Sequence, residues 1–415
     1  GPVDTVREDP VRKGLLYAGT ENSVYVSFDD GDHWQSLQLN LPHTSMRDLW
    51  IHDDDLIVAT HGRSFWVLDD ITLLRQIPEA AKAEAFLFKP APAVRARRDT
   101  NTDTPIPPDE PTAENPPTGA VIDYFLAQPA TGPVTLEIFD ARGKLVRRYS
   151  SADKPEVTEE DLRKTLSVPP YWVRRPQTVS AESGAHRWEW DLHYPPPDSL
   201  RHEYPISAIP HDTPRLPVGP RALPGRYLVR LTVNGHTFTA PLTVKMDPRV
   251  KTPPAGLNEQ FRAETRLASM MTETTGALRQ GRALREQLGK LKGQASGSLG
   301  ESIQALDKKL SALLGSPGGF FGAVLTGSTL TRLSGNVGTL YGDVDSADAA
   351  PTAAQTKAVG ESERDITEVM KRWNELKKKD IPSLNTQLRQ ANLPELRLGP
   401  ESQPGEADST ETNLD

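Results

Sequence analysis

The chain has 415 residues, of which 36% are hydrophobic, and it carries a formal net charge of −8. This charge gives no overall basic field for nucleic acid, and the absence of cysteine excludes disulfides, thiolate catalysis and cysteine metal sites. No run approaches the roughly 18 apolar residues that a membrane helix needs. The length predicts two to four domains, and the 37 prolines and 30 glycines indicate a loop-rich protein.

Residues 1–78 contain short apolar segments separated by turn residues. Such segments at intervals of about ten residues predict an antiparallel meander. Two sets of them match each other, 17–20 with 58–62 and 23–30 with 64–70. The repeat of roughly 40 residues is the period of a β-propeller blade.

The turn between two of these strands has the pattern S-x-D-x-G-x-x-W. Its members are Ser27, Asp29, Asp30, Gly31 and Trp34. The aspartates can accept hydrogen bonds from the loop's own backbone, and glycine allows a positive φ. The tryptophan offers a large apolar face that would hold the hairpin against its neighbour. We therefore interpret the motif as structural. Calcium at Asp29, Asp30 and the nearby Asp32 is a weak alternative, because the loop lacks the ligand count of an EF-hand-type loop.

The repeat covers fewer than two blades, whereas propellers close with about four to eight or more. The first set starts at a second strand, and the second set lacks its last strand. Such a piece would leave open sheet edges and an uncovered apolar face. We expect this chain to be the C-terminal end of a longer propeller protein. Its expected partners are the remaining blades, on the same precursor or on another chain.

The motif resembles the Asp-box of BNR repeats in sialidase-like and sortilin-like β-propellers. Residues 9–74, with Thr60-His61-Gly62-Arg63-Ser64-Phe65-Trp66-Val67-Leu68-Asp69-Asp70-Ile71, resemble the last blades of bacterial BNR-repeat proteins commonly named glycosyl hydrolases. The resemblance implies a secreted, periplasmic or cell-envelope protein of bacterial origin. It implies a fold and establishes no activity.

The middle of the chain predicts a linker and then a β-sandwich. Residues 79–119 hold a short connector and a stretch rich in Pro, Thr, Asp and Glu, which is typical of an extended linker. Within residues 120–252, apolar and polar residues alternate with period two, and Asn234-Gly235 is a strong hairpin signal. This pattern predicts an immunoglobulin-like or fibronectin type III-like sandwich, with insertions at roughly 151–183 and 195–223.

The last part of the chain changes to helical periodicity. Residues 253–398 carry apolar stripes at helical spacing and predict helical hairpins or a bundle. The first stripe comprises Leu257, Phe261, Leu267, Met271, Leu278, Leu284, Leu288 and Leu291. Residues 399–415 are acidic and polar, and we expect them to form a disordered tail. The predicted fold class is thus multidomain and mainly β: partial propeller blades, a sandwich and an α-helical bundle.

His61, Arg63 and Trp66 are the candidate binding residues. Propeller loops of this kind border the central channel or the blade rim, and Arg63 could bind a carboxylate as sialidase arginines do. A sialidase also needs further arginines, a tyrosine nucleophile with its base, and an acid from several blades, so the catalytic residues stay unknown. The spacing of His202 and His211 predicts no zinc site, and we predict no metal and no cofactor.

The leading prediction is a noncatalytic binding module with a protein, peptide or glycan ligand, without nucleic-acid binding and without a membrane span. One alternative is part of a BNR-type glycoside hydrolase whose catalytic residues lie on blades outside this chain. The other is a structural assembly subunit in which the helical region oligomerises. Whether the chain belongs to an enzyme is left open by the sequence.

Overall fold

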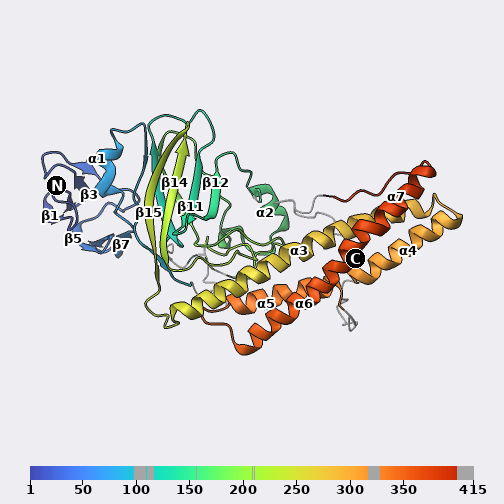
Figure 1. Cartoon of the computed structure of the whole chain (residues 1–415). Coiled ribbons are helices and arrows are strands. Elements are labelled where there is room, and N and C mark those ends of the chain that lie inside the picture. Colours follow the sequence, from blue (N-terminus) through green and yellow to red (C-terminus); the bar gives the residue numbers. More distant parts are fainter. Residues whose placement is uncertain are drawn as a thin grey trace.

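The computed structural model describes residues 1–97, 109, 116–155, 157–207, 209, 211–315 and 328–399. Two small sheets, a sandwich of two further sheets and a bundle of long helices follow one another across the molecule (Figure 1). Of the described residues, 35% are in helices and 25% in strands. The expectation of a mainly β chain is therefore wrong for the part of the chain that the structure describes. Of the predicted tail at 399–415 only Gly399 is among these residues, and most of the Pro-rich stretch lies outside them.

The N-terminal part consists of two antiparallel sheets, which we call sheet A and sheet B. Sheet A has the strand order β1-β2-β3-β4, and sheet B has the order β5-β6-β7. The strands are β1 (Val3–Glu8), β2 (Leu16–Thr20), β3 (Val24–Ser27), β4 (Gln35–Ser36), β5 (Met46–His52), β6 (Asp55–Thr60) and β7 (Phe65–Leu68). Sheet A has four strands because β1 pairs with β2, so the prediction that the first set starts at its second strand is wrong. In the described residues sheet B has three strands, without a partner beyond β7, as predicted.

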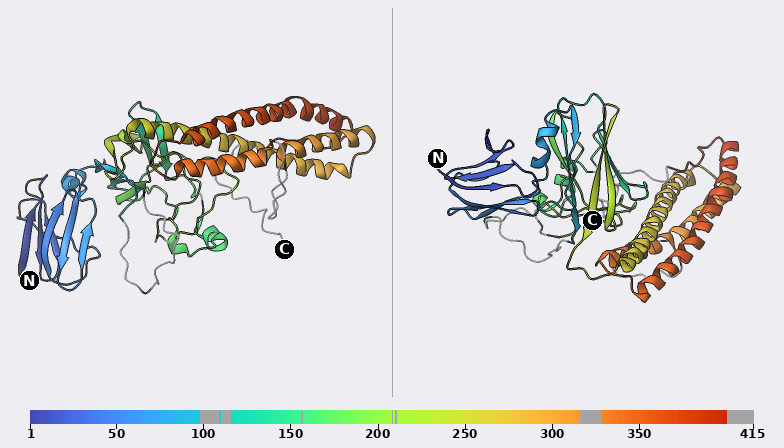
Figure 2. Two further views of the ribbon diagram at one scale, coloured as in Figure 1. Left: turned by 90° about the horizontal axis from the view of Figure 1, so that it is seen from below. Right: turned by 60° about the vertical axis from the view of Figure 1, so that its left-hand side comes forward.

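Sheets A and B pack face to face and enclose one core (Figure 2). Tyr17, Val24 and Val26 from sheet A and Leu49, Leu56 and Val58 from sheet B are buried there. The strands approach closely at Gly19, where an added Cβ would lie 2.9 Å from the Met46 carbonyl oxygen. After β7 the chain leaves through η1 (Leu74–Gln76) and the short helix α1 (Ile77–Ala80).

The second part contains a three-stranded sheet of order β13-β10-β8 and a five-stranded sheet of order β12-β11-β14-β15-β9. Its strands are β8 (Ala85–Leu87), β9 (Ala93–Arg95), β10 (Ala120–Leu126), β11 (Thr135–Asp140), β12 (Leu145–Ser150), β13 (Gly184–Trp190), β14 (Gly225–Val233) and β15 (His236–Met246). Strands β8 and β9 come from the segment that the sequence predicts as linker. The predicted hairpin is confirmed, because Asn234 and Gly235 have positive φ and Val233 pairs with His236.

The core of this second part is formed by alternating residues of both sheets. Ile122, Leu136, Trp190 and Leu231 are fully buried. The first insertion adds the helix α2 (Glu159–Thr165) and the turn η2 (Pro170–Trp172), which enclose a small separate cluster around Trp172 and Val173. In the second insertion the ring centroids of Tyr194 and of Phe261 in the helical part lie 5.2 Å apart.

The third part is an elongated helical bundle (Figure 1). It comprises α3 (Pro254–Lys292), α4 (Gly297–Leu314), α5 (Leu330–Asp345), α6 (Ala353–Glu375), a π-helical turn η3 (Leu376–Asp380) and α7 (Ile381–Gln390). The predicted stripe of α3 is buried, except that Phe261 is half-buried against Tyr194. Among the described helices, none is long and apolar enough to cross a membrane.

A buried ionic cluster joins the bundle to the sandwich. Arg95 of β9 donates to Asp348 in the α5–α6 connection at 2.8 Å, and both side chains are nearly inaccessible to solvent. Arg97 binds Asp348 and Asp345, both at 2.9 Å. Glu264 of α3 accepts a hydrogen bond from a backbone N–H in the second insertion at 3.3 Å. A buried pair with one partner removed is costly, so this cluster fixes where the bundle meets the sandwich.

Candidate functional site

The strands of sheet B are apolar on both faces. The inner face, with Leu49, Val58 and Trp66, is turned toward sheet A. The opposite face, which we call the front face of sheet B, carries Trp50, Ile57, Ala59, Phe65 and Val67. In register, Trp50 lies opposite Ile57 and Ile57 opposite Val67, while Ala59 lies opposite Phe65. The front face therefore holds one apolar row across all three strands, Trp50, Ile57 and Val67, and beside it Ala59 and Phe65, whose neighbour on β5 is Asp48.

This front face is open to solvent. Phe65 is 74% exposed, Trp50 62% and Val67 53%. Single exposed apolar side chains are normal, but a contiguous apolar patch on one sheet face marks an interaction surface. Burying each of these large side chains would contribute roughly 1.5–3 kcal/mol. Continuous apolar runs are typical of strands covered on both faces, and runs such as Phe65-Trp66-Val67-Leu68 are the sequence signal for this surface.

The outer edge of sheet B is also unpaired. In sheet A the edge strand β4 pairs with β3, with Tyr25 opposite Ser36 and Val26 opposite Gln35. Strand β7 has no corresponding partner among the described residues. The main-chain N–H and C=O groups on the side of β7 that faces away from β6 can therefore pair with a further strand.

The predicted Asp-box forms a tight, self-contained turn after β3. The Ser27 hydroxyl donates to Asp29 Oδ1 at 2.9 Å and accepts from the Gly31 N–H at 2.9 Å. Asp30 and Gly31 have φ of 59° and 96°. Asp29 also accepts from the His33 N–H, and Asp29 Oδ2 lies 2.7 Å from His33 Nδ1. The motif therefore orders the hairpin through local hydrogen bonds.

The position of Trp34 in this turn differs from the sequence reasoning. Trp34 is 39% exposed and packs beside Gly31, so it covers its own turn. It is outside the core between the sheets, where we expected it to hold the hairpin on its neighbour. Both carboxylate oxygens of Asp29 accept bonds inside the turn, and the described part of the chain contains no cluster of three or more metal-ligating side chains.

Electrostatics within the turn follow from the pairing of Asp29 with His33. The backbone and side-chain hydrogen bonds from His33 lower the pKa of Asp29 to about 2. The same pair raises the pKa of His33 above its ordinary value. Because both groups are exposed, solvent screens their attraction and the pair orders the turn without adding much stability.

His61, Arg63 and Trp66 do not converge on one site. His61 and Arg63 are exposed in the β6–β7 turn, whereas the Trp66 ring points toward sheet A. The Trp66 indole N–H donates to the Arg63 carbonyl at 2.9 Å, so the indole orders the turn. The His61 N–H and carbonyl bind Ser45 and Thr44. These contacts tie the turn to the segment before β5.

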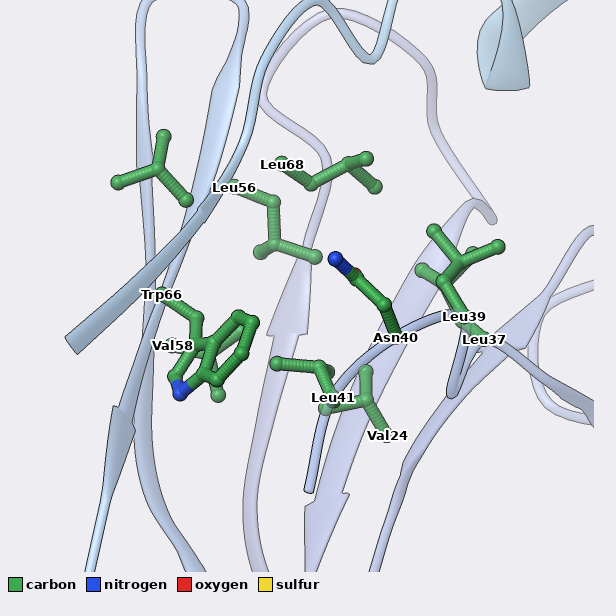
Figure 3. Close-up of a pocket in the computed structure, with 10 residues that line it drawn as sticks. Val24, Leu37, Leu39, Asn40, Leu41, Leu56, Val58, Trp66 and Leu68 are labelled. Carbon is green, nitrogen blue, oxygen red and sulfur yellow. The ribbon is translucent and has the colours of Figure 1, made fainter. Parts of the chain in front are cut away.

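Trp66 also lines a small cavity between sheets A and B (Figure 3). The cavity has a volume of about 40 Å³ and is surrounded mainly by aliphatic side chains, with Asn40 directed toward it. A single water needs at least about 10–15 Å³ measured in this way. The cavity is therefore too small for an organic ligand, and Trp66 acts as a core residue.

A larger hollow of about 560 Å³ lies where the sandwich meets α3. Tyr194, Phe261 and residues 195–197 form its apolar wall, and Arg142 and Lys144 from the β11–β12 turn stand at its rim. Tyr194, at the start of the second insertion, therefore packs between the sandwich and the bundle. His202 in the same insertion is partly buried, and this burial lowers its pKa to about 4.

No known family model matches the chain, and no curated protein matches it either.

Proposed function

We propose that the chain is a noncatalytic interaction module whose sheet B docks a further antiparallel sheet, as successive blades of a β-propeller dock. The repeat in the sequence supports this reading. Strand β3 corresponds to β7, so Val24 and Val26 occupy the places of Phe65 and Val67. The strand pairing makes Ile57 the equivalent of Tyr17, one position before the matched range 58–62, because Tyr17 lies opposite Val26 and Ile57 lies opposite Val67.

The proposal rests on one observation: the equivalent faces of sheets A and B differ in how far they are buried. Tyr17, Val24 and Val26 of sheet A are buried, because they pack on the inner face of sheet B. The equivalent front face of sheet B is solvent-exposed. A head-to-tail repeat places the same kind of contact at every junction. The occupant that fits is therefore another sheet of this repeat, presenting residues like Val58 and Trp66.

The open edge of β7 supports the same occupant. Sheet A gains its fourth strand from β4, and a docking sheet or its connecting segment would supply the matching strand to β7. Main-chain pairing along an edge gives affinity, and side-chain contacts on alternate positions give specificity. We place the module in a BNR-type propeller protein of the bacterial envelope or exterior, with residues 120–252 as an immunoglobulin-like sandwich beside it.

Site-specific photo-crosslinking in the source cells tests the proposal. Val67 is replaced by the photoreactive amino acid benzoylphenylalanine, and cross-linked peptides are identified by mass spectrometry. We expect one dominant cross-link to an apolar strand of an antiparallel sheet, on the same precursor or on another chain.

Leu145 of β12 is the matched control, because it is a 44% exposed aliphatic residue on a strand of the sandwich. A cross-linking yield at position 67 no higher than at position 145 would refute the proposal. A dominant cross-link to a helix or to a glycan-bearing protein would also contradict it, because neither is a sheet of the repeat.

A further inference from the structure

The chain turns back after α7 and forms an extended segment that we call the strap, residues 393–399. Asn392 has φ of 56° and reverses the chain, and Pro394 prevents the helix from continuing. The strap then runs beside α3 (Figure 1). Only Leu396 of the strap is fully buried, with 4% exposure in the core of the bundle.

Side-chain amides of the bundle bind the strap through its main chain. Asn385 of α7 donates to the Leu396 carbonyl at 3.0 Å and accepts from the Leu396 N–H at 2.7 Å. Gln287 of α3 donates to the Arg397 carbonyl and accepts from its N–H, both at 2.9 Å. Gln280 donates to the Gly399 carbonyl at 2.7 Å.

This pattern is that of a neighbouring β-strand. In a hydrogen-bonded pair of an antiparallel sheet, each residue donates its N–H to the C=O of the residue opposite and accepts from that residue's N–H. Asn385 and Gln287 make this exchange with single side chains, and so they recognise an extended main chain whatever its side chains are. The buried side chain of Leu396 is the main apolar anchor, and Leu393 packs partly buried against the same core, while Glu395 and Arg397 remain exposed.

We propose that Asn385, Gln287, Gln280 and the pocket of Leu396 form a binding site for an extended leucine-bearing peptide, and that the strap is its intramolecular ligand. Recognition rests on Leu396, on the partly buried Leu393 and on the main chain of the strap. The Glu395–Arg389 pair lies at the surface, where such pairs contribute little. This site is independent of sheet B and of its proposed partner.

A peptide supplied in trans tests the site. Leu396→Glu in the full chain releases the strap, and a fluorescently labelled peptide of residues 393–399, Leu-Pro-Glu-Leu-Arg-Leu-Gly, is titrated by fluorescence anisotropy. We expect saturable binding to Leu396→Glu and at least about tenfold weaker apparent binding to the wild type, whose own strap competes at a high effective concentration. Replacing the central leucine of the peptide by aspartate should weaken binding by about tenfold or more.

Asn385→Ala in the Leu396→Glu background should weaken binding by about tenfold, because two hydrogen bonds are lost. Gln390→Ala, at an exposed position of the same helix, should leave binding unchanged. A chain that ends after Asn392 provides a second strap-free form should Leu396→Glu fail to fold. The proposal is overturned if neither strap-free form binds the peptide, or if the aspartate peptide binds as well as the leucine peptide.

Discussion

Glu264 shows how strongly burial changes the chemistry of one residue. It is 1% exposed in α3, and burial, followed by the negative charge of Asp345, raises its pKa from 4.5 to about 7. The nearby Arg95 and Arg97 and the Arg221 N–H oppose this increase. The carboxyl group of Glu264 therefore keeps its proton in the folded protein over a pH range in which the same group in the unfolded chain has lost it.

We predict that the Glu264→Gln variant removes a pH-dependent loss of stability. Between pH 4.5 and about 7 the folded state binds the extra proton, so rising pH lowers the free energy of unfolding. The free energy of unfolding falls in total by an amount on the order of 3 kcal/mol, and it stays lowered above about pH 7. Glutamine cannot ionise, so the Tm of Glu264→Gln relative to wild type should rise from pH 5 to pH 8 in thermal unfolding scans. Glu259→Gln, on the exposed side of α3, should show no such trend.

A second residue-scale prediction concerns the Asp-box. Asp29→Asn removes the carboxylate that raises the pKa of His33, so this pKa should fall toward its ordinary value. An NMR titration of the imidazole resonances measures this change. Asp32→Asn should lower the same pKa by less, because Asp32 is the weakest influence on His33. An unchanged pKa in Asp29→Asn would show that the two side chains do not pair in solution.

Single residues were predictable from the sequence only where the chemistry is local. The Asp-box turn was predictable, because the groups that bond to Ser27 lie within a few positions of it. The strap site was not, since Gln280, Gln287 and Asn385 are ordinary amides on two helices far apart in the chain. Trp66 was predicted as a binding residue, yet its ring packs between the sheets because its strand carries apolar residues on both faces.

Strands β2 and β5 approach each other closely at Gly19. An added Cβ would lie 2.9 Å from the Met46 carbonyl oxygen and 2.9 Å from Thr5 Cγ2. We therefore expect Gly19→Ala to lower the free energy of unfolding of the N-terminal part by about 1–3 kcal/mol. Gly132→Ala is the control, since its Cβ would meet no atom within 4 Å. Chemical denaturation followed by tryptophan fluorescence measures both, and an equal effect of the two would contradict the close approach.

The periodicity of apolar residues predicted the long helices and strands but did not predict where each of them begins and ends. The apolar stripe of α3 correctly predicted a helix that buries Leu267, Leu278 and Leu284. The sequence does not predict the first strand of sheet A, because the buried residue of β1 is the polar Thr5 and its Val3 and Val6 are exposed. Strands β8 and β9 were assigned to a linker, because three-residue strands gain their stability from neighbours distant in the chain.

At the scale of the whole molecule, the two ends are built differently. The bundle and the sandwich close their own cores and are joined by buried charges around Asp348. Sheets A and B close one core between them and leave the front face of sheet B to solvent. The sequence predicted that an apolar face would stay uncovered, but only the strand register identifies which residues form it. The central proposal is therefore that a further sheet covers the front face in the assembled protein.

Hydroxyl-radical footprinting of Trp50 and Phe65 tests this proposal most directly. Oxidation rates are measured by mass spectrometry for the isolated chain and for the protein purified from its source cells. We predict that both residues are oxidised several-fold more slowly in the source-cell protein, because a docked sheet excludes solvent. Tyr171, which is 38% exposed in the first insertion, should be oxidised equally in both samples. Equal rates at Trp50 and Phe65 in the two samples would contradict a covered front face.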